Sequence, residues 1–249
     1  MKKSVLEGFI KRYSLGGKVS AVNWIVKGDT IQVTGTDEHR EIVCIVGAKG
    51  VSGIADGKYG IFDTKVALAL LGVLDAEINP EVKTIDLGEQ GQIPIKIHIK
   101  DSTNTQVDIA LANSEVIPKA PEMQDNSLPV WDIEAKMSKA LVSKFKAAAA
   151  AMTFSTFSIV TTGDLAELVI GHGQSNSDKF TLKLETTKTD DIQTVSFSND
   201  AFMQILGVIN NIEEVTLKVS QHGIAFLESR DGDFVSRYFL LAKEEMAND

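Results

Sequence analysis

The sequence predicts an α+β fold made of two similar domains, and three observations support this. Residues 62–74 and 197–209 align without gaps at a constant offset of 135, with Phe, Leu, Gly and Val at identical places. Strand-like runs follow one another directly, which is typical of antiparallel sheets. The order helix, strands, helix, strands occurs in each half of the chain. Because the repeat period is about half the chain, it indicates a duplicated domain rather than a solenoid.

The first half opens with a helix over residues 4–15, because its apolar side chains recur at helical spacing and Gly16-Gly17 can end it. The repeat helix begins after Phe62, with Asp63 or Thr64 as its cap. Ile93, Ile95, Ile97 and Ile99 alternate with polar residues or Pro94, as expected for a half-buried strand. The expected strands cover 19–27, 30–35, 40–48, 82–87, 93–100 and 105–112.

Residues 115–130 interrupt the pattern and predict an extended connector. The segment holds three of the five prolines and has no periodicity. The sequence therefore divides into a first domain over 1–114, the connector over 115–130 and a second domain over 131–249.

The second half repeats the order of the first. A helix is expected over 132–151, and the second repeat helix begins at Ser198 or Asn199. Each domain then consists of two helix-plus-meander units, with the helices on one face of curved antiparallel sheets. The expected strands cover 155–162, 164–171, 179–185, 193–197, 214–220, 223–228 and 234–242.

Composition is that of an ordinary globular protein, with 43% apolar and 24% charged residues. No apolar run reaches the roughly 18 residues that a membrane span needs, and residues 1–15 do not resemble a signal peptide. The single cysteine, Cys44, excludes internal disulfides and fits a reducing compartment. We therefore expect a cytoplasmic location and no membrane partner.

The net charge of −9 argues against a polyanionic partner, but the basic residues are segregated. Residues 1–18 contain five cations against Glu7 alone. The helix expected over 132–151 contains four lysines against two acids, and Lys136, Lys139 and Lys146 share one face of it, with Ser143. Such faces can follow phosphates without reading bases. The five cations near the N-terminus are Lys2, Lys3, Lys11, Arg12 and Lys18.

Signs of catalysis are absent from the sequence. The four histidines, His39, His98, His172 and His222, lie in separate segments without ligand spacing. The stretch 53–59 is one residue short of a phosphate loop and reads better as a turn and a strand. We therefore expect no enzyme, no cofactor and no metal.

Several segments together resemble a DNA polymerase sliding clamp, with a PCNA-like fold and local sequences most similar to the clamps of T4-like tailed phages. They are Ile61–Asp63 leading into Leu71–Ile78, the closing meander over Val215–Ser220, Gly223–Glu228 and Phe234–Ala242, and the N-terminal helix with Lys2, Lys3 and Phe9. The sequence departs from the family in the loop 171–178 and in the helix 197–209, which carries no basic residue.

The resemblance implies a processivity factor for DNA replication. Three two-domain chains would close into a homotrimer around double-stranded DNA, bound independently of sequence. A DNA polymerase and a clamp loader would be the protein partners. Edge strands near 105–112 and 179–185 would pair between neighbouring chains, which would also protect them. The residues expected to face DNA from the inner helices are Lys2, Lys3, Lys11, Arg12, Lys18, Lys65, Lys136, Lys139, Lys144 and Lys146.

The same resemblance implies an apolar pocket beside the connector, where partner proteins dock short peptides. By position, the candidates are Leu128, Val130, Phe239, Leu240 and Leu241, although each could equally be an ordinary core residue.

Three alternatives remain open at this point. The chain could be a monomeric processivity factor of the same fold that grips DNA with one basic face. It could be a phage structural or assembly protein with a duplicated β-rich domain and no affinity for DNA. An enzyme with a scattered site is the third and least favoured alternative.

Overall fold

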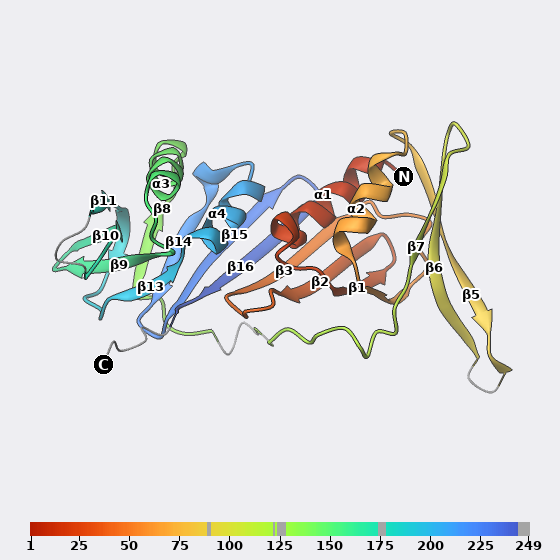
Figure 1. Ribbon diagram of the computed structural model, residues 1–249, viewed down its shortest axis with the longest axis horizontal. Coiled ribbons are helices and arrows are strands. Elements are labelled where there is room, and N and C mark those ends of the chain that lie inside the picture. The colour runs from red at the N-terminus through yellow and green to blue at the C-terminus, as the bar shows by residue number, and fades with distance from the viewer. Residues whose placement is uncertain (89–90, 122, 124–127, 174–177, 244–249) are drawn as a thin grey trace. The chain divides into compact units, whose positions relative to one another are not determined.

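The structure is a computed structural model, and it describes residues 1–88, 91–121, 123, 128–173 and 178–243 (Figure 1). It divides into two compact units. The first comprises Met1–Glu38, Cys44–Ala120 and Arg230–Ser236, and the second His39–Val43, Pro121–Ser229 and Arg237–Asp249. The domain limits expected from the sequence stay a prediction. Among the described residues, no helix is long and apolar enough to cross a membrane.

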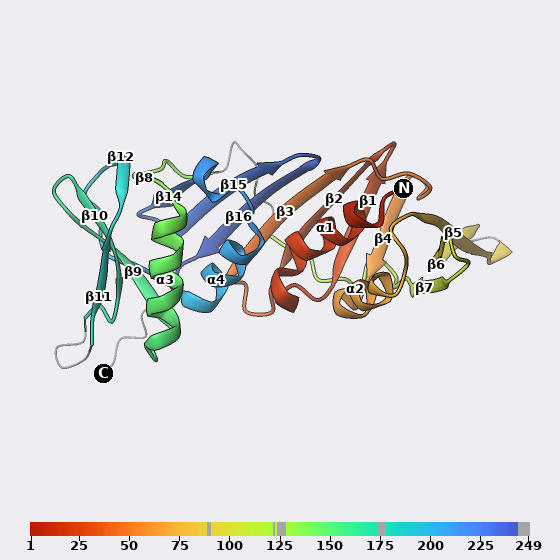
Figure 2. The same ribbon diagram turned by 90° about the horizontal axis from the view of Figure 1, so that it is seen from above.

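The first unit holds two helices and antiparallel strands. The strands β3, β2, β1 and β4 are neighbours in this order, and β5-β6-β7 form a three-stranded sheet. The helices α1 and α2 contact each other and lie on one side of the strands (Figure 2). The elements are α1 (Lys3–Ser14), η1 (Leu15–Gly17), β1 (Val22–Lys27), β2 (Thr30–Thr36), β3 (Ile42–Lys49), β4 (Gly57–Ile61), α2 (Thr64–Gly72), β5 (Ile78–Asp86), β6 (Gln92–Asp101) and β7 (Gln106–Ala110).

The second unit repeats this plan. The strands β12, β8, β14, β15 and β16 are neighbours in this order, β11-β10-β9-β13 form a four-stranded sheet, and α3 contacts α4. The elements are β8 (Ile133–Lys136), α3 (Lys139–Ala151), β9 (Thr156–Thr162), β10 (Leu165–Ile170), β11 (Phe180–Lys183), β12 (Glu185–Thr189), β13 (Val195–Ser198), α4 (Asn199–Val208), η4 (Ile212–Glu214), β14 (Thr216–Ser220), β15 (Ile224–Asp231) and β16 (Phe234–Leu241). The α+β class and the duplicated arrangement are thus confirmed.

Aromatic side chains attach the helices to the sheets. In the first unit, Phe9 and Tyr13 of α1 pack edge-on at 5.2 Å, and Trp24 of β1 lies 5.8 Å from Phe9. The Trp24 indole donates a hydrogen bond of 3.0 Å to the Tyr13 hydroxyl, so the buried polar groups are satisfied. In the second unit, Phe145 of α3 packs against Phe157 and Phe202 at 5.4 and 5.2 Å.

The two sequence copies are equivalent helices with equivalent caps. Asp63 accepts a hydrogen bond of 2.9 Å from the Val66 amide at the start of α2. At the same place in α4, the Ser198 hydroxyl accepts one of 3.3 Å from the Ala201 amide. Asp and Ser are both strong N-cap residues, so each of the two helices begins one residue after its cap.

The structure corrects the sequence prediction at two places. Residues 132–151 are not one helix, because β8 occupies 133–136 and α3 begins only at Lys139. Ser138 caps α3 by accepting a hydrogen bond from Leu141 N at 3.1 Å, which fixes the start of the helix there. The strand β12 was missed altogether. The described part of the expected connector contains no helix or strand, and residues 122 and 124–127 lie outside the described residues.

Candidate nucleic-acid interface

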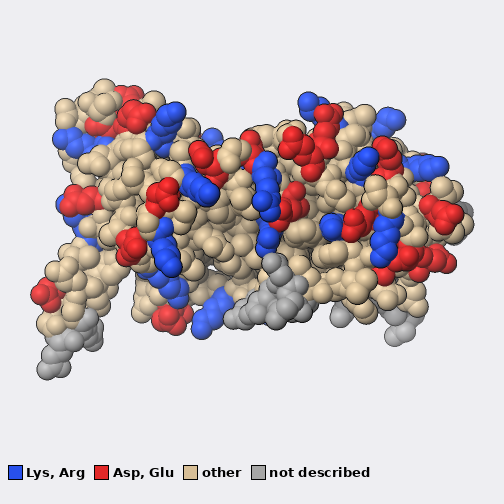
Figure 3. Space-filling view, turned by 180° about the vertical axis from the view of Figure 1, so that it is seen from behind, with Lys and Arg blue, Asp and Glu red and all other residues tan. Residues whose placement is uncertain are grey.

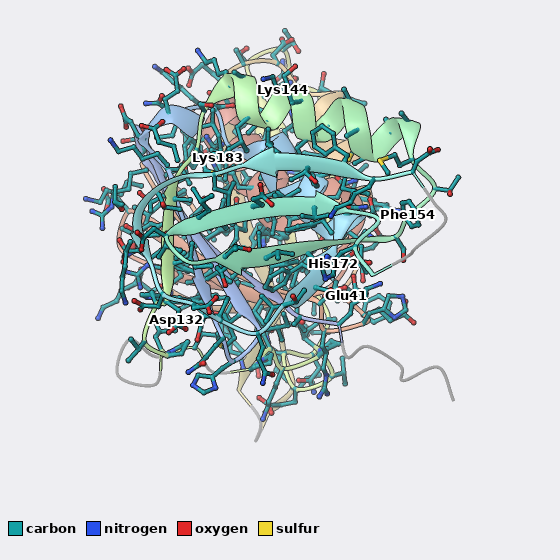
Figure 4. The ribbon with its side chains drawn as sticks, turned by 90° about the vertical axis from the view of Figure 1, so that its left-hand side faces the viewer. Glu41, Asp132, Lys144, Phe154, His172 and Lys183 are labelled. Atoms are coloured by element: carbon teal, nitrogen blue, oxygen red, sulfur yellow. The ribbon has the colours of Figure 1, made fainter. Side chains whose placement is uncertain are left out.

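The basic surface of the second unit is carried by α3. Leu141 and Phe145 are buried beneath the helix, which turns the opposite side to solvent. Lys139 and Lys144 are exposed and Lys146 is half-buried. The helix contains no carboxylate. Its three lysines therefore give an uninterrupted positive charge, and Figure 4 shows Lys144 on the outward side of α3.

The lysines of α3 have no ion-pair partner among the described residues. The ion pairs lie elsewhere, as with Lys218 and Glu134 at 3.0 Å and Arg237 and Glu228 at 2.7 Å. These pairs lie on strands, and in Figure 3 basic and acidic side chains alternate over the side of the molecule seen from behind. An unpaired ammonium group can bind a phosphate without first breaking an ion pair with a carboxylate. The surface of α3 is therefore better suited to binding a polyanion than the strand surfaces with their ion pairs.

The sequence predicted that Lys136 lies on this helix surface, but the structure places it on a strand. It is the last residue of β8, opposite Thr216 of β14 and Glu185 of β12. The assumed spacing of Lys136 from Lys139 and Lys146 on one helical face is therefore wrong, although Lys136 is exposed.

The N-terminal cations divide into exposed and engaged groups. Lys2 is exposed, and Lys11 is 59% exposed with Glu7 3.7 Å away. Lys3 is only 18% exposed, because its ammonium group donates to the Leu74 carbonyl and lies 3.8 Å from Glu7. Lys2 and Lys11 can thus meet an external anion directly, whereas Lys3 ties α1 to the end of α2.

Arg12 is a correction to the predicted DNA-facing set. Its guanidinium lies 2.6 Å from Asp231 and 3.9 Å from the ring centroid of Phe234. It also donates to the Gly8 carbonyl at 3.1 Å, and the residue is 9% exposed. The turn between β15 and β16 lies in Arg230–Ser236, which belongs to the first unit, and Arg12 clamps this turn to α1.

Lys65 lies over the turn that precedes Lys18, although the two segments are far apart in the sequence. The stem of Lys65 crosses Gly17, where an added Cβ would lie 2.0 Å from the Lys65 Cε. Gly17 also has φ +94°, which favours glycine. The Thr64 amide and hydroxyl both donate to the Ser20 carbonyl at 2.9 Å, which holds the start of α2 against this turn. Lys65 is thus positioned at the junction of α1 and α2 by its contact with Gly17.

The five residues predicted for the peptide pocket do not line one common surface. Phe239 and Leu240 are 1% and 0% exposed, so neither can line an open surface. Because side chains alternate along β16, Leu240 also faces away from Phe239 and Leu241. Val130 is 76% exposed, and Leu128 and Leu241 are half-buried. A docking surface here stays a prediction, reduced to Leu128, Val130 and Leu241.

The sequence analysis missed an aromatic column on the second unit. Trp131 stacks on Phe226 at 5.5 Å with an interplanar angle of 19°. Phe226 in turn packs on Phe239 at 4.9 Å. The sequence could have indicated Phe226, because side chains alternate along a strand. Phe226 lies between the buried Ala225 and Leu227 and therefore on the opposite face of β15.

The two predicted edge strands are sheet edges in the structure. β7 pairs with β6, and β11 pairs with β10, and each ends its sheet. Just beyond β7, the Ala112 amide donates to the Gly60 carbonyl of β4 at 2.9 Å, so the outer edge there is already bonded. Because Leu111 N bonds to Ile95 O, the alternating pattern turns the Ala110 amide to the outer edge of β7. By the same argument from Leu184 N, which bonds to Ala166 O, the amides of Thr181 and Lys183 face outward from β11. Figure 4 shows β11 lying beside α3.

Groups suited to metal binding do not gather in the described part of the chain. No cluster of three or more His, Cys, Asp or Glu residues occurs there. Burial raises the pKa of the Cys44 thiol to about 12, so it is an inert core group.

No protein-family model and no curated protein matches the sequence. Solved structures of proliferating cell nuclear antigen (PCNA) do match it. The PCNA of Entamoeba histolytica is 14% identical, with 98% of this chain and 96% of that chain covered and a TM-score of 0.69. A. fulgidus PCNA, solved with the C-terminal region of FEN-1 bound, is 12% identical, with coverages of 98% and 97% and a TM-score of 0.69. PCNA of Thermococcus kodakaraensis is 15% identical, with 98% of each chain covered and a TM-score of 0.66.

The chain has the PCNA-type clamp fold. The match runs over nearly the full length of both chains, so it includes both units and all four helices of the described part. The similarity to the T4-like subgroup remains a prediction from the sequence. In this clamp fold, the unpaired lysines lie on the first helix of the second unit, and Lys2 and Lys11 lie on or beside the first helix of the first unit.

Proposed function

We propose that the protein is a sliding clamp that encircles duplex DNA as a homotrimer and tethers a replicative DNA polymerase. The observation that carries the proposal is the PCNA-type clamp fold over 98% of the chain, combined with unpaired lysines on α3. A protein that slides must hold DNA by charge without reading bases, and lysines on a helix surface do this. A clamp loader is the partner that a closed ring requires.

The two free sheet edges support ring closure. Exposed edges of β7 and β11 are templates for pairing with another chain. Pairing β7 of one copy with β11 of the next is a head-to-tail contact, and three such contacts close a cyclic trimer. The same contact removes both free edges, which a monomer would leave open.

The test is the solution mass by light scattering over a range of concentrations. The expected result is a mass of three chains at micromolar concentration, with dissociation on dilution. A mass of one 27.0 kDa chain at every concentration would contradict the ring and favour a monomeric processivity factor.

A variant pair shows whether β7 closes the ring. Ala110→Pro removes the outward amide of β7 while the bonds to β6 remain, so it should dissociate the trimer. Ala110→Ser keeps that amide and should leave the mass unchanged. Equal masses for the two variants would show that the edge of β7 is not in the interface.

A further inference from the structure

The outer edge of β5 is covered only over its first residues. β5 ends the three-stranded sheet β5-β6-β7 (Figure 1). The Ile78 amide donates to the Met1 carbonyl at 2.9 Å. Gly53 lies against Pro80, because an added Cβ would be 2.7 Å from the Pro80 carbonyl oxygen. Beside residues 82–86, however, no further strand lies in the part of the chain that the structure describes.

The second unit shows that the same place in the fold accepts an added strand. β14 follows α4 as β5 follows α2. The four-residue strand β8 pairs along the outer edge of β14, with Ala135 opposite Leu217 and Ile133 opposite Val219. β14 is thus bonded on both sides, whereas the described residues leave β5 bonded on one side beyond Pro80.

The free edge presents a regular row of hydrogen-bonding groups. Leu87 N bonds to Gly91 O across the hairpin, so the amides of Lys83 and Ile85 also point towards β6. The Ile78 amide, which points to the outer edge, fixes the same alternation from the start of the strand. An extended chain can pair with the groups that face outward. The residues whose amides and carbonyls face outward are Val82, Thr84 and Asp86.

Apolar side chains lie beside this edge. Ile85 and Leu87 are 46% and 49% exposed, and they share one face of β5 because side chains alternate along a strand. Ile93 of β6 lies directly opposite Ile85 and is half-buried. A strand added to β5 would cover Ile85 with its own side chains, so it would bury apolar surface as well as pair backbone groups.

Charge indicates the chemistry of the partner. The edge strand and the turn before it, residues 75–86, contain a single cation, Lys83, and its ammonium group lies 2.6 Å from Glu81. All of the carboxylates in this segment are exposed. They belong to Asp75, Glu77, Glu81 and Asp86. A basic segment therefore complements the edge, whereas a second copy of β5 would bring like charges together.

We propose that residues 82–86 of β5 bind an extended segment of a partner protein by strand addition, and that this segment alternates apolar and basic residues. Its apolar side chains lie on the face of Ile85 and Leu87, and its basic side chains lie on the face of Asp86. The site is on the edge of the sheet opposite β7, so it does not depend on the proposed ring.

The test is the binding of a labelled peptide, measured by fluorescence anisotropy. The peptide alternates valine and lysine over about six residues and is capped at both ends. Salt at about 0.15 M screens its long-range attraction to the acidic protein. We expect saturable binding, and a peptide of alternating valine and glutamate should bind at least about tenfold more weakly. Lack of saturation by the lysine peptide, or equal affinity for the two peptides, would contradict the proposal.

A variant pair separates pairing at the edge from general attraction to an acidic surface. Thr84→Pro removes an outward amide and leaves the bonds from β5 to β6 in place. It also removes the hydroxyl that donates to Gln92 at 3.1 Å, so the matched control is Thr84→Ala, which loses the hydroxyl and keeps the amide. Thr84→Pro should lower the affinity for the lysine peptide at least about tenfold, and Thr84→Ala should bind it as the parent protein does. Equal affinities of the two variants would overturn strand addition.

Amide hydrogen exchange tests the same contact in the parent protein. The lysine peptide should slow exchange at Val82, Thr84 and Asp86 and leave Lys83 and Ile85 unchanged, because the latter amides are already bonded to β6. Slowing elsewhere on the protein but not on β5 would place the peptide at another site and overturn the proposal. A solution mass that falls on Thr84→Pro would show a second copy of the chain on this edge, which would overturn it as well.

Discussion

Some charged side chains of this protein stabilise the fold, although their charge suggests that they bind a ligand. Arg12 is the clearest case, because its sequence context predicts a DNA contact and its guanidinium is instead used by Asp231 and Phe234. A buried arginine is stabilised only when its donors are paired, and this one finds a carboxylate, a carbonyl and a ring face. Exposure and partners, rather than charge alone, decide which cations can reach a ligand.

Glu41 is a residue whose charge links three segments of the second unit. Its carboxylate lies 2.9 Å from the Lys243 ammonium group. Burial pushes the pKa of Glu41 up, but hydrogen bonds from Lys243 and Ser198 outweigh this and lower it below the ordinary value. Ser198 also caps α4, so the carboxylate orients a capping hydroxyl.

A lowered pKa means that the charged form of Glu41 stabilises the fold. That contribution is complete above the unfolded pKa of about 4.3 and is lost as the pH falls through the folded value. Glu41→Gln should therefore lower the free energy of unfolding at pH 7 by about 0.5–1 kcal/mol, since the pair is partly open to solvent. The difference from the parent protein should shrink towards pH 3.

The measurement is denaturant unfolding at pH 7 and at pH 3. Glu38→Gln, at an exposed neighbouring position, is the control and should change stability little at either pH. A Glu41→Gln effect that is equal at the two pH values would show that the charge of Glu41 is not the cause.

At the scale of elements, the sequence predicted most helices and strands because their periodicity is strong. The alternating isoleucines of β6 and the repeated helices α2 and α4 are the best examples. The start of α3 was misplaced because Met137, which is buried just after β8, continues the four-residue spacing of Leu141 and Phe145. Only the sheet partners of β8 separate the two interpretations.

The candidate site was predicted less well than the fold. Its lysines were found because local charge can be read from the sequence. Partners distant in the sequence decide which cations are engaged, as with Arg12 and Asp231, 219 residues apart. For the same reason, the burial of Phe239 under Phe226 could not be foreseen from the segment 234–242.

The helix α3 should dominate binding to duplex DNA. Lys139→Glu/Lys144→Glu replaces two unpaired cations by anions, and we expect at least about a tenfold loss of affinity at low salt. Fluorescence anisotropy with a labelled duplex measures this loss. The fold should be unaffected, because both side chains are exposed.

The matched control for α3 is Lys27→Glu/Lys49→Glu. Both residues are exposed, and each alternates with buried residues that face the helices, so they lie on the opposite side of their sheet. The change in net charge is identical. Equal losses of affinity for the two double variants would show that overall charge, and not α3, governs binding.

At the scale of the whole molecule, the net charge of −9 and the basic helices have complementary effects on the proposed binding of DNA. An acidic protein repels DNA except where cations are concentrated, so the proposed binding would be confined to the surface of α1 and α3. Weak electrostatic binding permits sliding but cannot by itself keep a protein on DNA. Retention must then come from topology, which is what ring closure provides.

A closed ring and a one-sided grip differ in their response to salt. At about 1 M salt the Debye length is about 3 Å, so contacts between lysines and phosphates are largely screened. A monomer held by α3 alone should dissociate under these conditions. Trimers assembled around circular DNA, by concentrating dissociated chains in its presence, should remain bound because release requires an interface to open. Gel filtration at high salt measures retention, and cutting the circle once should release the protein. Loss from the intact circle as fast as from the cut one would leave only the one-sided grip.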